Sequence, residues 1–371
     1  MKASVVFLLL VVAAGAVGAW GAEVTGASPL LDALSFVPAA VVSTIVLFTD
    51  WSVLKAYVGF DEAFRESPED AEKALASSLG QGQAAVSAFG ANHLEEAALW
   101  GWCSSDLEWE ANFPNGTGIP VYVLRFRSGF QFGPLMSLFE QRNFAQTESH
   151  GVAVYSHALD LRVEWLVKSE LAILNTAVVA EEGLLVLSSS LAALDEVLSA
   201  YREEVPTLSA DAAAQAVAGR LEGVASAILV IGPGACWSLS ADPALEFFVN
   251  ASDPQGLYAT VKALLTLRAD LHVYNGFGVG YHYDGEVPVG SFVLHFLDPA
   301  SASLDLPLRR ALAESGASAQ GGQPYSQVAF TMRGAGAEGS DLIFTVRPVG
   351  DEPRRLFRMV FARDMLFALC P

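Results

Sequence analysis

Short β-rich segments alternate along the chain with segments whose apolar residues recur at helical spacing. Residues 43–49 read as a buried strand, and residues 121–127 alternate between apolar and polar side chains as a half-buried strand does. A hairpin is predicted over residues 277–296, because Asp284-Gly285 supplies the positive φ angles that two-residue turns need. Sequence-adjacent strands with short turns indicate antiparallel pairing.

Several helices carry start and stop signals. Ser190 is a predicted N-cap. Asp305 with Pro307 predicts a helix start, and Gly316 predicts its end. Three further strands are predicted over residues 327–332, 342–347 and 356–361. The pattern predicts an α+β fold with largely antiparallel sheets and helices packed on one face.

Two parts of the pattern resemble each other. Residues 121–155 and residues 292–332 each contain a strand, a helix that begins near a Pro-Leu pair, and another strand. We therefore expect two related strand–helix–strand units. They fall in predicted lobes at residues 23–235 and 236–371, although one continuous domain is an alternative.

The first 22 residues differ from the rest. Lys2 precedes the apolar run from Val5 to Val12, and small residues follow, which is typical of a cleaved export signal. The mature chain is then expected to begin near residue 20 or 23. A retained membrane anchor is the alternative, but the apolar run is shorter than the roughly 20 residues of a spanning helix, and no later run reaches that length. We expect an exported protein in the periplasm, at the cell surface or secreted.

Composition adds a constraint on partners. The 371 residues are 52% hydrophobic, which is ample for a packed core. With 21 Lys and Arg against 41 Asp and Glu, the formal net charge is −20. That field repels nucleic acids and anionic lipids, so a polyanion is not an expected partner.

The chain has three cysteines, and export favours a disulfide. We predict that Cys236 and Cys370 pair and that Cys103 stays reduced. Cys370 is the penultimate residue, where a terminus benefits from tethering, and Cys236 follows a Gly-Pro-Gly break. Three buried thiols are the alternative.

Several segments carry a resemblance to known sequences. They are Asp106–Glu110, Tyr155–His157, Asn175–Val178, Glu182–Ser190 and Arg363–Ala368. In these the chain resembles an uncharacterised group of exported bacterial proteins. The resemblance implies export but no activity, so no functional residue is transferred from it.

Two segments bear on chemistry. The glycines of Gly276–Gly280 lead into a predicted strand, so they favour close backbone packing over a nucleotide loop, which needs a helix N-terminus. Asp106, Glu108 and Glu110 alternate and would share one face of a strand. They could bind calcium or act as acid and base, but a solvated face is the favoured interpretation.

Histidines and arginines offer weaker signals. His150 and His157 should face opposite sides of a strand, and no histidine lies four residues from another. A pocket that held His157 or His282 close to an acid would favour catalysis. Four arginines are concentrated near the C-terminus, and we expect intramolecular pairing rather than a partner for Arg354, Arg355, Arg358 and Arg363.

No nucleophile, metal or nucleotide motif is recognisable in the sequence, so we expect no catalytic residues, no metal and no cofactor. The leading hypothesis is a non-catalytic exported protein that is structural or binds another protein at the cell envelope. A binding module for a small apolar or peptide ligand is the first alternative. A hydrolase with dispersed catalytic residues is the second.

Overall fold

The computed structural model describes residues 28–39, 44–67, 69–71, 73, 75, 100–158, 174–236, 270–318 and 322–371. The predicted export signal lies outside these residues. The fold is α+β and is organised around one antiparallel sheet, which confirms the fold class expected from the sequence.

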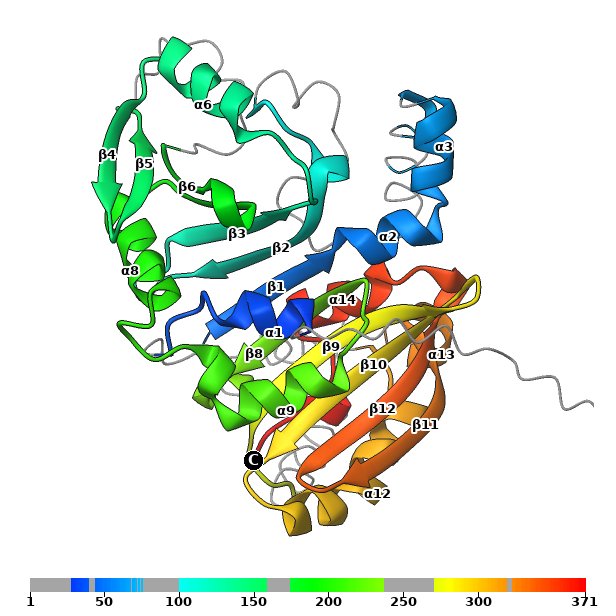
Figure 1. Cartoon of the computed structure of the whole chain (residues 1–371). Helices are drawn as coiled ribbons and strands as arrows, with labels where there is room; N and C mark the ends of the chain where they lie inside the picture. The colour runs from blue at the N-terminus through cyan, green and yellow to red at the C-terminus, as the bar shows by residue number, and fades with distance from the viewer. Residues whose placement is uncertain are drawn as a thin grey trace, which may run out of the picture.

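The sheet contains twelve strands in the order β11-β12-β10-β9-β8-β1-β2-β3-β7-β6-β5-β4, and every neighbouring pair is antiparallel (Figure 1). The strands of the first half are β1 (Thr44–Asp50), β2 (Leu107–Pro114), β3 (Pro120–Phe126), β4 (Ala145–Ser149), β5 (Val152–Ser156), β6 (Asn175–Val179) and β7 (Leu184–Ser188). Those of the second half are β8 (Ser226–Ile231), β9 (Tyr274–Asp284), β10 (Val287–Phe296), β11 (Phe330–Glu338) and β12 (Asp341–Pro348).

Helices cover both faces of the sheet, so the expectation of one covered face is wrong. The front face carries α1 (Pro29–Leu34), α8 (Leu191–Tyr201) and α9 (Ala212–Arg220). The back face carries α2 (Trp51–Tyr57), α3 (Phe60–Glu66), α6 (Phe132–Gln141), α12 (Pro299–Ser315), α13 (Tyr325–Val328) and α14 (Arg354–Phe361). In Figure 1, α9 crosses in front of β9, while α12 lies behind β11 and β12.

Alternation along the strands explains the two covered faces. Val46 and Phe48 of β1 belong to the core in front of the sheet, and Leu47 between them packs against the core behind it. A central strand that is apolar on both sides must be covered on both sides. The apolar content of this chain therefore fills two core layers.

The two proposed strand–helix–strand units are not equivalent. Three antiparallel steps separate β3 from β5, so those strands are antiparallel, whereas two steps separate β10 from β11, so they are parallel. A different correspondence is present: outward from the β1–β8 pair, the order β1-β2-β3-β7-β6 on one side matches β8-β9-β10-β12-β11 on the other. The sheet is continuous across the lobe boundary predicted at residue 235, because β8 pairs with β9.

Local signals succeeded at some element ends and failed at others. The β9–β10 hairpin is confirmed, with Gly285 at a φ of 62° in its turn, and Ser190 caps α8 through the amide of Ala193. The predicted start at Asp305 is wrong, because Asp298 is the N-cap of α12 and Pro307 lies inside that helix.

The segment predicted as a strand over residues 356–361 is the helix α14. Its buried residues Leu356, Phe357, Met359 and Val360 fall at helical spacing, which brings them to one side. The same short run also reads as β-rich, so periodicity alone could not decide between the two.

Candidate functional site

The three carboxylates expected on one face do not form a common site. Asp106 lies in a short 3₁₀ turn and pairs with Arg127 at 3.1 Å. Glu108 is half-buried, at the irregularity where β2 shifts its register with β3. Glu110 is only 2% exposed and accepts a hydrogen bond of 3.0 Å from the indole of Trp51. The expectation of a solvated face is therefore wrong at Glu110, because α2 covers this part of the sheet.

His150 occupies an ion-pair network on the surface. It lies in the β4–β5 turn with a φ of 50°, and its ring nitrogens lie 2.9 Å from Glu204 and 3.3 Å from Asp195. The hydrogen bond to Glu204 raises the pKa of His150. Ser149 donates to Asp195 rather than to the imidazole. The network ties a turn to the helix α8 and leaves no activated nucleophile.

Two other histidines face carboxylates that arginines also engage. His272 lies 2.6 Å from Asp305, and His295 lies 2.7 Å from Asp341. The second carboxylate also accepts from Arg220 at 2.9 Å, and these hydrogen bonds lower the pKa of Asp341 against the effect of its burial. Among the described residues, no hydroxyl or thiol is bonded to either imidazole. Both networks have the composition of structural ion pairs.

The two histidines singled out from the sequence, His157 and His282, lie in different surroundings. The Nδ1 atom of His157 lies 2.5 Å from the carbonyl oxygen of Ala158, and its ring packs on Phe144. His282 lines a surface hollow of about 490 Å³ that also contains Glu222, without a hydrogen bond between the two. The arrangement at His282 therefore lacks the pairing that acid–base catalysis requires.

The glycine-rich segment serves helix packing. Gly278 in β9 lies so close to α9 that a Cβ atom would be 2.4 Å from Val217 and 2.8 Å from Leu221. A Cβ on Gly276 would lie 3.0 Å from Val217. These glycines let the helix approach the strand, in agreement with the packing interpretation, and no helix N-terminus follows them.

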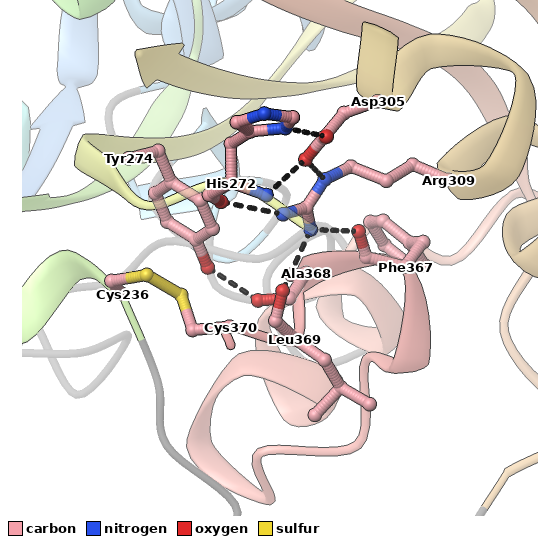
Figure 2. Close-up of a disulfide and its surroundings, with 9 residues drawn as sticks. All are labelled: Cys236, His272, Tyr274, Asp305, Arg309, Phe367, Ala368, Leu369 and Cys370. Atoms are coloured by element: carbon pink, nitrogen blue, oxygen red, sulfur yellow. Dashed lines mark hydrogen bonds and ion pairs between the residues drawn. A yellow bond between two sulfur atoms is a disulfide. The ribbon is translucent and has the colours of Figure 1, made fainter. Parts of the chain in front are cut away.

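The structure joins Cys236 to Cys370, the pair named from the sequence, with their Cα atoms 5.5 Å apart (Figure 2). Cys103 is half-buried and unpaired as a disulfide, with its sulfur 2.9 Å from the hydroxyl of Ser105. The bridge fastens the end of the chain to the segment after β8.

A buried arginine holds the same C-terminal segment from another side. Arg309 donates to the carbonyl oxygens of Phe367 and Leu369, both at 2.8 Å, and Tyr274 donates to Ala368 (Figure 2). Asp305 neutralises the guanidinium at 2.8 Å. The disulfide and this cluster therefore form an anchor for the C-terminus.

A hollow on the front face is the best candidate for a binding site. We call it the acidic pocket; it has a volume of about 520 Å³, within the range of roughly 300–1,000 Å³ usual for ligand sites. Segments from α1, β3 and α8, and the loop that follows α8, enclose it. Its lining residues are Asp32, Ser35, Phe36, Arg125, Glu182, Ala200, Tyr201, Glu203, Glu204, Val205, Pro206, Thr207, Ser209 and Ala210.

Charge in the acidic pocket is one-sided, with four carboxylates against one guanidinium. Arg125 pairs with Asp32 at 3.0 Å and donates to the carbonyl oxygen of Glu182. Glu204 engages His150. Glu203 is exposed, and its backbone has a positive φ of 59°. The remaining negative charge favours a cationic ligand.

An aromatic wall stands beside these carboxylates. The rings of Phe36 and Tyr201 are stacked, with centroids 5.5 Å apart and planes inclined by 5°. The Tyr201 hydroxyl donates to Glu182. Burial and that hydrogen bond raise the pKa of Tyr201 to about 12, so the hydroxyl remains a donor at neutral pH. Phe36 is only 3% exposed, and the guanidinium carbon of Arg202 lies 4.9 Å from the centroid of the Tyr201 ring, so the Tyr201 ring already has a cation over it beside the carboxylates.

Neither a cluster of metal-ligating side chains nor a membrane-spanning helix is present in the part of the chain that the structure describes. No group of three or more His, Cys, Asp or Glu side chains is arranged there to hold a metal ion. No described helix combines the length and the apolar character needed to cross a bilayer.

Comparison with known proteins does not assign the chain to a family. No family model matches the chain, and no curated protein matches it. Two solved structures, described as crystal forms I and IV of TP0453, align over 89% of this chain and 96% of theirs. Their identities are 9% and 10%, with TM-scores of 0.36 and 0.35, a likeness too low to inform function. The resemblance to exported bacterial proteins stays a prediction.

Proposed function

We propose that this chain is an exported, non-catalytic binding protein whose acidic pocket recognises a cationic side chain of a protein partner. One observation carries the proposal: a hollow with four carboxylates and one arginine lies beside the stacked rings of Phe36 and Tyr201. Carboxylates attract a cation to the pocket, and the Tyr201 ring, over which Arg202 already lies, is the aromatic side chain that a ligand cation would contact in competition with Arg202.

The histidine networks support a non-catalytic role. The histidines that contact carboxylates belong to larger ion-pair networks. His150 contacts two carboxylates, and the carboxylate that His295 contacts also pairs with an arginine. A catalytic histidine needs one ring nitrogen directed at a nucleophile or a substrate proton.

Export is supported by two independent features. The sequence of residues 1–22 has the composition of an export signal. A disulfide between Cys236 and Cys370 is expected to persist in an oxidising compartment such as the periplasm or the cell exterior. The protein would then meet its partner outside the cytoplasm.

Calorimetric titration with a short basic peptide tests the function. The probe is a tetrapeptide of alternating Arg and Phe, and its counterpart contains Glu in place of Arg. We expect the basic peptide to bind and the acidic one not to bind. The variant Glu203→Lys with Ala210→Arg reverses a charge in the pocket and fills it with a larger side chain. It is expected to bind the basic peptide at least tenfold more weakly.

The matched control places the same changes elsewhere. Glu148 and Ala145 are both exposed on the edge strand β4, so Glu148→Lys with Ala145→Arg alters the net charge equally. This variant should bind like the wild type. Equal weakening in both variants would show that net charge, and not the pocket, determines binding.

A further inference from the structure

A basic surface lies on the back of the protein, at the C-terminal end of α14. Phe361, at the end of α14, is 63% exposed, and Arg358 lies one turn before it on the same side. Arg363 follows with a φ of 51° and is also exposed. We call Arg358, Phe361 and Arg363 the C-terminal basic surface.

The expected intramolecular pairing holds for only part of the arginine group. Arg354 and Arg355 contact Glu352 at 3.4 Å and 3.1 Å, and Arg355 also donates to the carbonyl oxygen of Val328. Among the residues that the structure describes, Arg358 and Arg363 make no side-chain hydrogen bond or ion pair.

Two uncompensated cations beside a large exposed ring are unusual in a chain with a net charge of −20. An exposed aromatic side chain next to arginines has the composition of an interface anchor. The charge complement of this surface would be an acidic hollow with apolar walls.

The acidic pocket provides that complement, but not within the same molecule. Leu356 and Phe357 of α14 pack in the core behind the sheet, whereas Phe36 and the α8 residues pack in the core in front of it. The twelve-stranded sheet separates the two surfaces. Arg358 of one copy can therefore reach only the acidic pocket of another copy.

We infer that the protein associates head to tail, with the C-terminal basic surface of one copy docked on the acidic pocket of the next. The inference rests on the proposed function, because it assigns the pocket's cationic partner to a second copy of this chain. Contacts between two different surfaces repeat from copy to copy, so they produce rings or open chains of molecules rather than a two-fold dimer.

Complementary variants test the arrangement by sedimentation velocity of the purified chain. The pocket variant is Glu203→Lys with Ala210→Arg, and the surface variant is Arg358→Glu with Arg363→Glu. Each variant alone should be monomeric. Their equimolar mixture should associate, because the basic surface retained by the pocket variant can dock on the acidic pocket retained by the surface variant. The wild type should form larger species as its concentration rises.

Two further variants separate the docking surface from general charge. Arg333→Glu with Arg310→Glu reverses two other exposed arginines and should associate like the wild type. Phe361→Ser retains the charge but should shift association to at least tenfold higher concentration. A mixture that stays monomeric, or equal effects of both arginine pairs, would overturn the inference.

The peptide titration distinguishes failure of this inference from failure of the proposed function. If the wild type binds the basic tetrapeptide while the mixed variants stay monomeric, the pocket recognises a cation but not a second copy. If neither the peptide binds nor the mixture associates, both the function and the self-association are wrong.

Discussion

Arg309 and Asp305 form an ion pair in which both side chains are completely buried, with Nε and Oδ2 2.8 Å apart across one turn of α12. The remaining guanidinium donors reach the carbonyl oxygens of His272, Phe367 and Leu369. The charge and four of the five guanidinium N–H donors are thus used internally. A buried charge of this kind is tolerated only while its partner is present.

Replacing Arg309 by Met should destabilise the protein by about 3–5 kcal/mol, because the buried Asp305 would lose its arginine and keep only His272 as a side-chain partner, and three carbonyl oxygens would lose their donor. The double variant Asp305→Leu with Arg309→Met should lose less than the sum of the single losses. Urea unfolding of the four proteins measures the coupling. Additive losses would show that the pair does not act as a unit.

Loss of the disulfide should also be costly. The bridge between Cys236 and Cys370 spans 134 residues, and closing such a loop stabilises by about 4–5 kcal/mol in the chain-entropy model. Cys236→Ala with Cys370→Ala should lower the free energy of unfolding by that order. Reductant should destabilise the wild type and Cys103→Ser but not the double variant. A double variant that still responds to reductant would contradict this pairing.

Short-range features of this fold were predictable from the sequence. The β9–β10 hairpin and the cap at Ser190 depend on a few adjacent residues whose backbone preferences are strong. The run from Leu356 to Phe361 was not predictable, since its apolar residues fit a strand and a helix alike, and only packing beneath the sheet selects the helix. Local preference decides a structure only where one alternative dominates.

Contacts between distant segments could not be predicted from local sequence patterns. Thr49 and Ser226 share a hydrogen bond of 3.0 Å across the centre of the sheet, although 177 residues separate them. The acidic pocket likewise gathers Asp32, Arg125 and Glu203 from distant segments. The single usable hint was the excess of acidic over basic residues, which indicates a cationic partner but not where it binds.

Because the pKa of Asp50 is raised, the free energy of unfolding should fall as the pH rises. Its carboxylate caps α2 through the amides of Ser52 and Val53, and burial raises its pKa from 3.8 to about 6. Between those values the folded protein holds a proton that the unfolded chain has released, so unfolding becomes easier as pH increases. A rise of the pKa from 3.8 to about 6 lowers the free energy of unfolding by at most about 3 kcal/mol, and this loss is fully expressed above pH 6.

The variant Asp50→Asn isolates this effect, because asparagine retains the cap without a charge. It should be more stable than the wild type above pH 6, and the difference should shrink toward pH 4. The other shifted groups are the same in both proteins, so their contributions cancel in the difference: His150, with a raised pKa, stabilises below 6.5 and loses that contribution at higher pH, while Asp341 and Glu352, with lowered pKa values, lose theirs below 3.8 and 4.5. Denaturant unfolding at several pH values measures the difference, and a constant gap would contradict the assignment.

Replacing Gly278 by alanine tests whether the glycines of β9 are required for the packing of α9 on the sheet. A Cβ atom there would overlap Val217 and Leu221, so Gly278→Ala should force α9 away from the sheet and destabilise by about 1–3 kcal/mol. Gly336, in the edge strand β11, is the matched control because a Cβ atom there meets nothing within 4 Å. Gly336→Ala should be neutral or slightly stabilising, since alanine restricts the unfolded chain. Equal losses at both sites in thermal unfolding would mean that backbone freedom, rather than contact with α9, explains the glycines.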